Sequence, residues 1–179
     1  MVTIIHGGHR NGLCLNAALE FEQMLIARKC KVNLFDLRIF HTEFCCGEQP
    51  CQVSGRCVHT DMMTEEIIPA IALSDFLVIF TPTYFNMPPA LLKNFIDRCN
   101  VLLMLENRKP LGIATWISGQ ADECSLEACF RCLSSFAEVC EYTLIHECKI
   151  LRIESCLNHT NILLADIKKL EKLAQIICP

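Results

Sequence analysis

Short apolar runs alternate with longer amphipathic stretches along the whole 179-residue chain. The runs are typical of buried strands, and the stretches are typical of helices that cover a sheet. Strands are predicted at 2–5, 31–37, 75–81 and 110–118, with a fifth somewhere in 142–153. Helices are predicted at 13–29, 61–73, 89–103, 125–140 and 162–177. This alternation predicts β–α–β units, whose strands run parallel.

Five strands and five helices fit an α/β fold with a doubly wound parallel sheet in the order 2-1-3-4-5 and helices on both faces. The run at 75–81 is apolar almost throughout, as expected of a strand buried on both sides. No repeat, low-complexity tract or linker interrupts the pattern. We therefore expect a single domain over 1–179, with a cysteine-rich insertion loop at about 41–60.

The charge balance gives no surface for nucleic acid or for an anionic membrane. Charged residues make up 20% of the chain, the net charge is −4, and no Lys/Arg cluster is present. The longest apolar run, 67–80, is too short to span a bilayer and contains Pro69 and Asp75. The N-terminus lacks the features of a signal peptide, so we expect a cytoplasmic protein.

Cysteine is unusually frequent, with 14 residues. Without an export signal, we expect reduced thiols or metal ligands rather than disulfides. The helix at 125–140 carries an apolar stripe that favours core packing over ligation: Cys129, Cys132, Phe136 and Cys140. Five cysteines have no partner spacing and receive no assignment: Cys30, Cys99, Cys148, Cys156 and Cys178.

The loop after the first strand, GGHRNGLCLNA at 7–17, has the residues of a phosphate-binding turn. Glycines permit a sharp turn, and the N–H groups at a helix start favour an anion. An ordinary strand-to-helix turn is the alternative. His6 flanks the loop and could touch a phosphate or could be structural. The candidate ligands are Gly8, His9, Arg10, Cys14 and Asn16, of which Arg10 can add charge-assisted hydrogen bonds.

The segment 81–98 reads TPTYFNMPPALLKNFIDR and resembles the flavin-binding segment of the NADPH-dependent FMN reductase family. In that family Ser-Pro-x-Tyr follows strand 3, and Leu-Lys-x-x-Ile-Asp-Arg follows on the helix. The positions in register are Thr81, Pro82, Tyr84, Phe85, Leu92, Lys93, Phe95, Ile96, Asp97 and Arg98.

The resemblance implies a flavodoxin-like fold that binds FMN. The flavin ring would be lined by the loop residues Pro82, Thr83, Tyr84, Phe85, Asn86 and Met87. A flavin needs a flat apolar wall and a few backbone hydrogen bonds, which such a loop offers. The alternative is that Tyr84 and Phe85 are core aromatics.

The cysteine-rich loop resembles that of the iron–sulfur flavoprotein branch of the same family, which has C-x2-C-x2-C-x5-C followed by Asp-Asp-Met. Cys45, Cys51 and Cys57 match the first, third and fourth cysteine positions, whereas Glu48 stands at the second. Three interpretations stay open: no metal, a [4Fe-4S] cluster completed by another ligand, or a zinc site. The zinc site would combine these cysteines or Cys46 with His59 or His41.

The first loop and a third loop also bear on flavin binding. The family's Gly-Ser-x-Arg becomes Gly7-Gly8-His9-Arg10 here, so a phosphate-facing hydroxyl is missing and a lower FMN affinity is expected. The third loop, 118–125, matches by position the family's contact to the pyrimidine edge of the flavin, and Gly119 would bring the backbone close.

The resemblance implies an FMN-dependent oxidoreductase that takes electrons from NAD(P)H or a ferredoxin-type donor and passes them to a small acceptor. It also implies a homodimer or homotetramer. No catalytic side chain is assigned, because N5 of the flavin carries the chemistry. One alternative is a flavodoxin-like electron carrier without its own substrate. Another is a flavin-free module that acts by protein contact or thiol chemistry.

Overall fold

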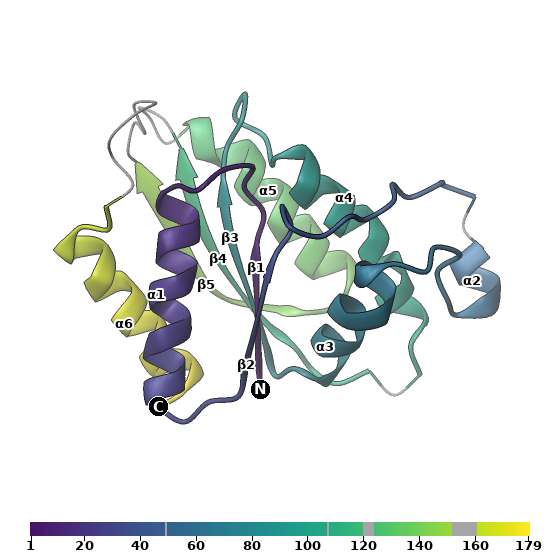
Figure 1. Ribbon diagram of the computed structural model, residues 1–179, viewed down its shortest axis with the longest axis horizontal. Coiled ribbons are helices and arrows are strands. Elements are labelled where there is room, and N and C mark those ends of the chain that lie inside the picture. Colours follow the sequence, from purple (N-terminus) through teal and green to yellow (C-terminus); the bar gives the residue numbers. More distant parts are fainter. Residues whose placement is uncertain (49, 107, 120–123, 152–160) are drawn as a thin grey trace.

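Five parallel strands form the central sheet (Figure 1). The computed structural model describes residues 1–48, 50–106, 108–119, 124–151 and 161–179. The strands are β1 (Val2–His6), β2 (Val32–Asp36), β3 (Phe76–Pro82), β4 (Gly112–Gly119) and β5 (Thr143–Leu151). They pair in parallel in the order β2-β1-β3-β4-β5, which confirms the doubly wound order predicted from the strand–helix alternation.

Helices cover both faces of the sheet (Figure 1). On one face lie α1 (Leu13–Ala27) and α6 (Leu164–Ile177), side by side. On the other lie α3 (Ile68–Leu73), α4 (Ala90–Arg98) and α5 (Cys124–Val139). None of the helices in the described ranges combines the length and the apolarity needed to cross a membrane.

The side-chain alternation of β3 divides the core into two layers. Val78 and Phe80 pack with α1 and α6, and the Phe80 ring stacks on Trp116 with centroids 5.9 Å apart. Leu77 and Ile79 pack on the opposite side, with α4 and α5. All four of these residues are completely buried, so the apolar positions within the run at 75–81 are explained by a strand with two covered faces.

Two predicted helices are less regular than expected. The helix predicted at 61–73 is a π-helical turn, η1 (Met63–Ile67), followed by α3. Pro69 has no N–H to donate, so a continuous α-helix is interrupted beside it. The helix predicted at 89–103 ends as an α-helix at Arg98 and continues as a 3-10 turn, η2 (Cys99–Met104). The cysteine-rich loop contains a short unexpected helix, α2 (Pro50–Ser54).

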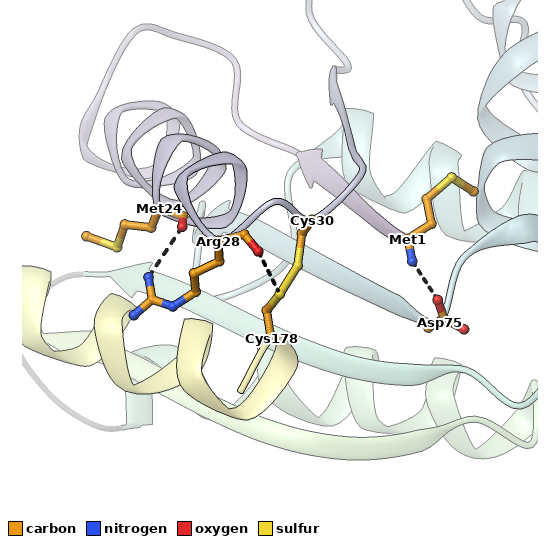
Figure 2. The surroundings of a disulfide bond; sticks show 6 residues. All are labelled: Met1, Met24, Arg28, Cys30, Asp75 and Cys178. Atoms are coloured by element: carbon orange, nitrogen blue, oxygen red, sulfur yellow. Dashed lines mark hydrogen bonds and ion pairs between the residues drawn. A yellow bond between two sulfur atoms is a disulfide. The ribbon is translucent and has the colours of Figure 1, made fainter.

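A disulfide joins Cys30, just beyond α1, to Cys178, just beyond α6 (Figure 2). The expectation of reduced thiols or metal ligands throughout was therefore wrong for this pair. The two cysteines are 148 residues apart in sequence, so spacing gave no signal. They meet because α1 and α6 pack together and end at the same side of the sheet. The Cys178 Sγ atom also lies 3.8 Å from the carbonyl oxygen of Arg28.

Candidate functional site

The loops that follow β1 and β3 lie together at the carboxyl ends of these neighbouring strands. The Gly7 N–H donates to the Phe80 carbonyl across a distance of 2.9 Å, which holds the first loop against β3. A small pocket opens between the two loops. Its lining brings together six of the predicted ligands with two other residues: Gly8, His9, Arg10, Cys14, Pro82 and Tyr84, with His6 and Gly12.

The first loop is packed too closely to admit a side chain at Gly8. A Cβ atom there would lie 2.8 Å from His6 Nε2 and 3.1 Å from Pro82 Cδ. Gly12 is the N-cap residue of the 15-residue helix α1 and has no side chain with which to cap it. The helix start therefore faces this loop with the positive end of its dipole. Together with Arg10, this arrangement fits the phosphate group of FMN.

The loop after β3 forms a tight turn that presents apolar side chains. Tyr84 and Met87 exchange two backbone hydrogen bonds of 3.0 Å. Phe85 and Asn86 between them adopt left-handed φ angles of 50° and 62°, the combination found in two-residue hairpin turns. Phe85 is fully exposed, which excludes the alternative that it is a core aromatic. The half-buried Tyr84 ring lies against His9, with centroids 5.4 Å apart.

The end of β4 completes the site from the other side of β3. The Cys14 Sγ and Ser118 Oγ atoms are 2.9 Å apart and hydrogen-bonded. The Thr83 N–H donates to the Ser118 carbonyl, also at 2.9 Å. Gly119, predicted to approach the flavin, is the buried last residue of β4, and residues 120–123 of its loop lie outside the described residues. Asn16 is in the first turn of α1 and does not line the pocket.

A chain of buried polar contacts beneath the first loop was not predicted. His6 Nδ1 lies 3.0 Å from Asp36 Oδ1, and Arg38 Nε lies 2.9 Å from the same oxygen. Arg38 Nη1 also donates to Asn11 Oδ1 at 2.6 Å, which links β2 to the loop. Burial raises the pKa of Asp36, but the hydrogen bonds from Arg38 and His6 outweigh it and lower the pKa to about 2. The sequence feature that could have indicated the His6–Asp36 contact is that each of these residues lies at the end of a strand.

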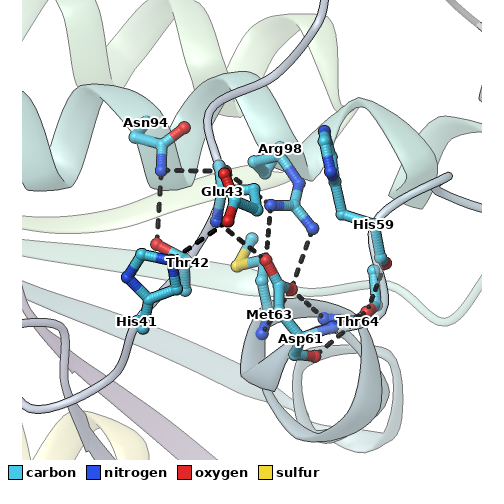
Figure 3. A network of polar contacts seen from close by, with 9 residues as sticks. All are labelled: His41, Thr42, Glu43, His59, Asp61, Met63, Thr64, Asn94 and Arg98. Carbon is cyan, nitrogen blue, oxygen red and sulfur yellow. Dashed lines mark hydrogen bonds and ion pairs between the residues drawn. The ribbon is translucent and has the colours of Figure 1, made fainter.

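Arg98 and Asp61, both in segments that resemble the family, bind each other rather than the pocket (Figure 3). The two guanidinium–carboxylate distances are 2.8 and 2.9 Å, and Arg98 is only 3% exposed. Arg98 also donates to the Glu43 carbonyl at 2.6 Å. Burial raises the pKa of Asp61, but the Arg98 hydrogen bonds and the Glu43 N–H outweigh it and lower the pKa to about 2. This network fixes both ends of the cysteine-rich loop to α4.

The three predicted metal ligands line a second, larger pocket of about 600 Å³ between the cysteine-rich loop, α4, η2 and α5. Across the parts of the chain with described coordinates, no three His, Cys, Asp or Glu side chains are close enough to hold a metal ion. The residues as placed therefore do not fit a four-thiolate cluster. Seven cysteines share the pocket wall: Cys45, Cys46, Cys51, Cys57, Cys99, Cys132 and Cys140.

The stripe predicted on α5 is confirmed as core packing for Cys129, Phe136 and Cys140, which are buried. Burial raises the pKa of Cys129 to about 12 and that of Cys140 to about 11, so both are protonated thiols at neutral pH. Cys132 is half-buried and faces the larger pocket.

Similar proteins include flavoproteins of several kinds. An iron–sulfur flavoprotein of Clostridioides difficile (strain 630) is 31% identical over 114 residues, which cover 62% of this chain and 51% of that protein. The chain thus spans about half the length of this curated relative. A flavone reductase structure has a TM-score of 0.70 at 15% identity, covering 99% of this chain and 61% of that one.

A third relative is an FMN-dependent NADH-azoreductase from Bacillus anthracis str. Ames Ancestor, solved in complex with FMN. It has a TM-score of 0.69 at 12% identity and covers 99% of both chains. At such low identity these two structures show the flavodoxin-like fold alone. Residues 1–131 match the family model described as NADPH-dependent FMN reductase. The pocket between the β1 and β3 loops thus lies in a chain that belongs to the NADPH-dependent FMN reductase family.

Proposed function

We propose that this chain is an FMN-dependent oxidoreductase that takes electrons from NAD(P)H or a ferredoxin-type donor and passes them to a small acceptor. The observation that carries the proposal is the meeting of two loops at the β1–β3 switch point, where Arg10 and the start of α1 lie beside Tyr84. Membership of the family supports FMN as the cofactor.

Each loop has a distinct role in holding FMN. The backbone of Gly8 and His9, the Arg10 guanidinium and the start of α1 would bind the phosphate. The turn from Pro82 to Met87 would lie along the flavin ring, with Ser118 and Gly119 near its far edge. When bound, FMN supplies the hydride and electron-transfer chemistry. The chain's own contribution is to bind and orient the flavin.

The exposed turn offers a surface next to the flavin on which another molecule or subunit could dock. Phe85 is fully exposed and Met87 is 51% exposed, although both lie beside the pocket. A donor, an acceptor or the second subunit of a homodimer or homotetramer would cover these side chains and exclude water from the ring.

A spectrum and a flavin titration test the proposal. Anaerobically purified protein should show resolved flavin bands or take up added FMN, and NADPH or NADH should bleach those bands. Fast bleaching by a reduced ferredoxin but slow bleaching by both nucleotides would identify a ferredoxin-type donor, and a reduced protein that then passes electrons to no small acceptor would favour the electron carrier. A colourless protein that takes up no FMN would refute the proposal and favour a flavin-free module. Iron and acid-labile sulfide, assayed on the same sample, test for a cluster.

A matched pair of variants locates the binding site. Arg10→Ala should weaken FMN binding by roughly tenfold or more, through the loss of a charge-assisted contact to the phosphate. Lys93→Ala removes the same charge from an exposed ion pair with Asp97 on α4 and should leave FMN binding unchanged. Equal effects of the two substitutions would place the phosphate elsewhere.

A further inference from the structure

We propose that His6 is a phosphate-binding residue of this pocket, held by Asp36 beneath Gly8 and replacing the serine hydroxyl that the first loop lacks. The inference rests on the proposed FMN site. It assigns a ligand role to a side chain that could otherwise be only structural.

The imidazole of His6 lies directly beneath the first loop. His6 ends β1, its side chain is 1% exposed, and it lines the pocket with Gly8 and Arg10. Its Nε2 atom lies 2.8 Å from the place that a Cβ atom on Gly8 would take. Real Cβ atoms do not come so close to another heavy atom, so the imidazole and a residue-8 side chain compete for one space. The glycine at position 8, where the family pattern has serine, is therefore linked to the presence of His6.

The partner of His6 determines which ring nitrogen faces the phosphate. Asp36 is ionised because its pKa is about 2, so its carboxylate can only accept hydrogen bonds. Nδ1, 3.0 Å from Asp36 Oδ1, therefore carries a proton. Nε2 is then the ring nitrogen on the side of Gly8, where it would donate a hydrogen bond to a phosphate oxygen when it also carries a proton. Arg38 holds Asp36 in place and binds Asn11 of the same loop.

A comparison of FMN with riboflavin tests this role, because riboflavin has the same ring but no phosphate. His6→Asn keeps an amide near the Nδ1 position, within reach of Asp36, but has no group at Nε2. It should weaken FMN binding roughly tenfold to a hundredfold and leave riboflavin binding unchanged. His6→Gln, whose amide reaches the Nε2 position, should retain much of the FMN affinity. Dissociation constants from quenching of flavin fluorescence give both values.

Serine at position 8 provides a second test. Gly8→Ser should weaken FMN binding in the wild type, because its Cβ displaces the imidazole. In the His6→Asn background the contact with Nε2 is removed and only the Pro82 ring, 3.1 Å from such a Cβ atom, remains, so the same substitution should weaken FMN binding less than it does in the wild type. In the unmodified protein, FMN but not riboflavin should shift the ¹⁵N resonance of His6 Nε2.

The outcomes separate the two proposals. A wild-type protein that binds neither flavin overturns both the proposed function and the role of His6. A wild-type protein that binds FMN, with equal losses for FMN and riboflavin in His6→Asn, overturns the role of His6 alone. So does an unmoved Nε2 resonance, or a Gly8→Ser effect that is the same in both backgrounds.

Discussion

Loss of the Cys30–Cys178 disulfide should lower the free energy of unfolding by an amount that approaches the total stability of many domains. The bond joins two cysteines that are 148 residues apart in sequence, and so closes a loop of that length. The chain-entropy relation gives about 5 kcal/mol at 25 °C for a loop of this length. This figure is an upper estimate, because compact unfolded chains have less entropy to lose. Typical domains are stable by only about 5–15 kcal/mol.

Guanidinium chloride unfolding of the wild type and Cys178→Ser, each with and without reductant, measures the effect. The wild type should unfold at a lower denaturant concentration when reductant is added, and should then match Cys178→Ser. The variant should not respond to reductant. Cys45→Ser, which removes an exposed free thiol, is the matched control and should behave as the wild type does.

Thiol titration in denaturant tests the same bond directly. Without reductant, Cys178→Ser should show one more reactive thiol than the wild type, because the substitution frees Cys30. A full count of thiols, together with a midpoint that does not respond to reductant, would refute the disulfide and restore the expectation of reduced cysteines.

Three other predictions concern the buried charges and the exposed turn. Arg98→Met should destabilise the fold by about 3 kcal/mol in urea unfolding, because it leaves the Asp61 carboxylate without its main partner; a loss below about 0.5 kcal/mol would contradict this. Asp36 and Asp61 have pKa values of about 2, below the usual 3.8, so each should contribute about 2 kcal/mol that is present above pH 4 and lost as the pH falls through about 2. Asp61→Asn should flatten this acid dependence, and an unchanged slope would count against the assignment. Phe85→Ser should leave the thermal midpoint unchanged, because the side chain is fully exposed, but should weaken flavin binding or subunit association in titration and sedimentation; a large drop in the midpoint would indicate hidden packing.

The strands and their order followed from the sequence because burial leaves a local signature. Residues 76–80 are apolar on consecutive positions, as expected of a strand covered on both faces. The rule that ligands bind at the carboxyl ends of parallel strands predicts Gly8, Arg10 and Tyr84 in one site, and all three line the same pocket. What the sequence predicted well therefore depends on periodicity and on chain order.

Contacts between distant segments were beyond such reasoning. His6 and Asp36 are partners because β1 and β2 pair with these two residues in register, which no spacing reveals. The same holds for Asp61 and Arg98, whose motifs were recognised separately but not as each other's ligands. The irregular turn before α3 depends on Pro69, a single residue whose effect on a helix varies with its surroundings.

The contacts of Arg98 with Glu43 and Asp61 have a consequence for how the cysteine-rich loop can change over evolutionary time. Glu43 and Asp61 lie 18 positions apart, yet the Glu43 N–H reaches Asp61 Oδ2 at 2.9 Å, and Arg98 binds both residues. The two ends of the segment between them therefore lie at one place on the domain. The contents of this segment can be gained, lost or replaced without strain on the sheet. Glu48, which departs from the cysteine pattern that this loop resembles, then carries no penalty for folding, and a short turn in place of 45–58 should still give a folded protein.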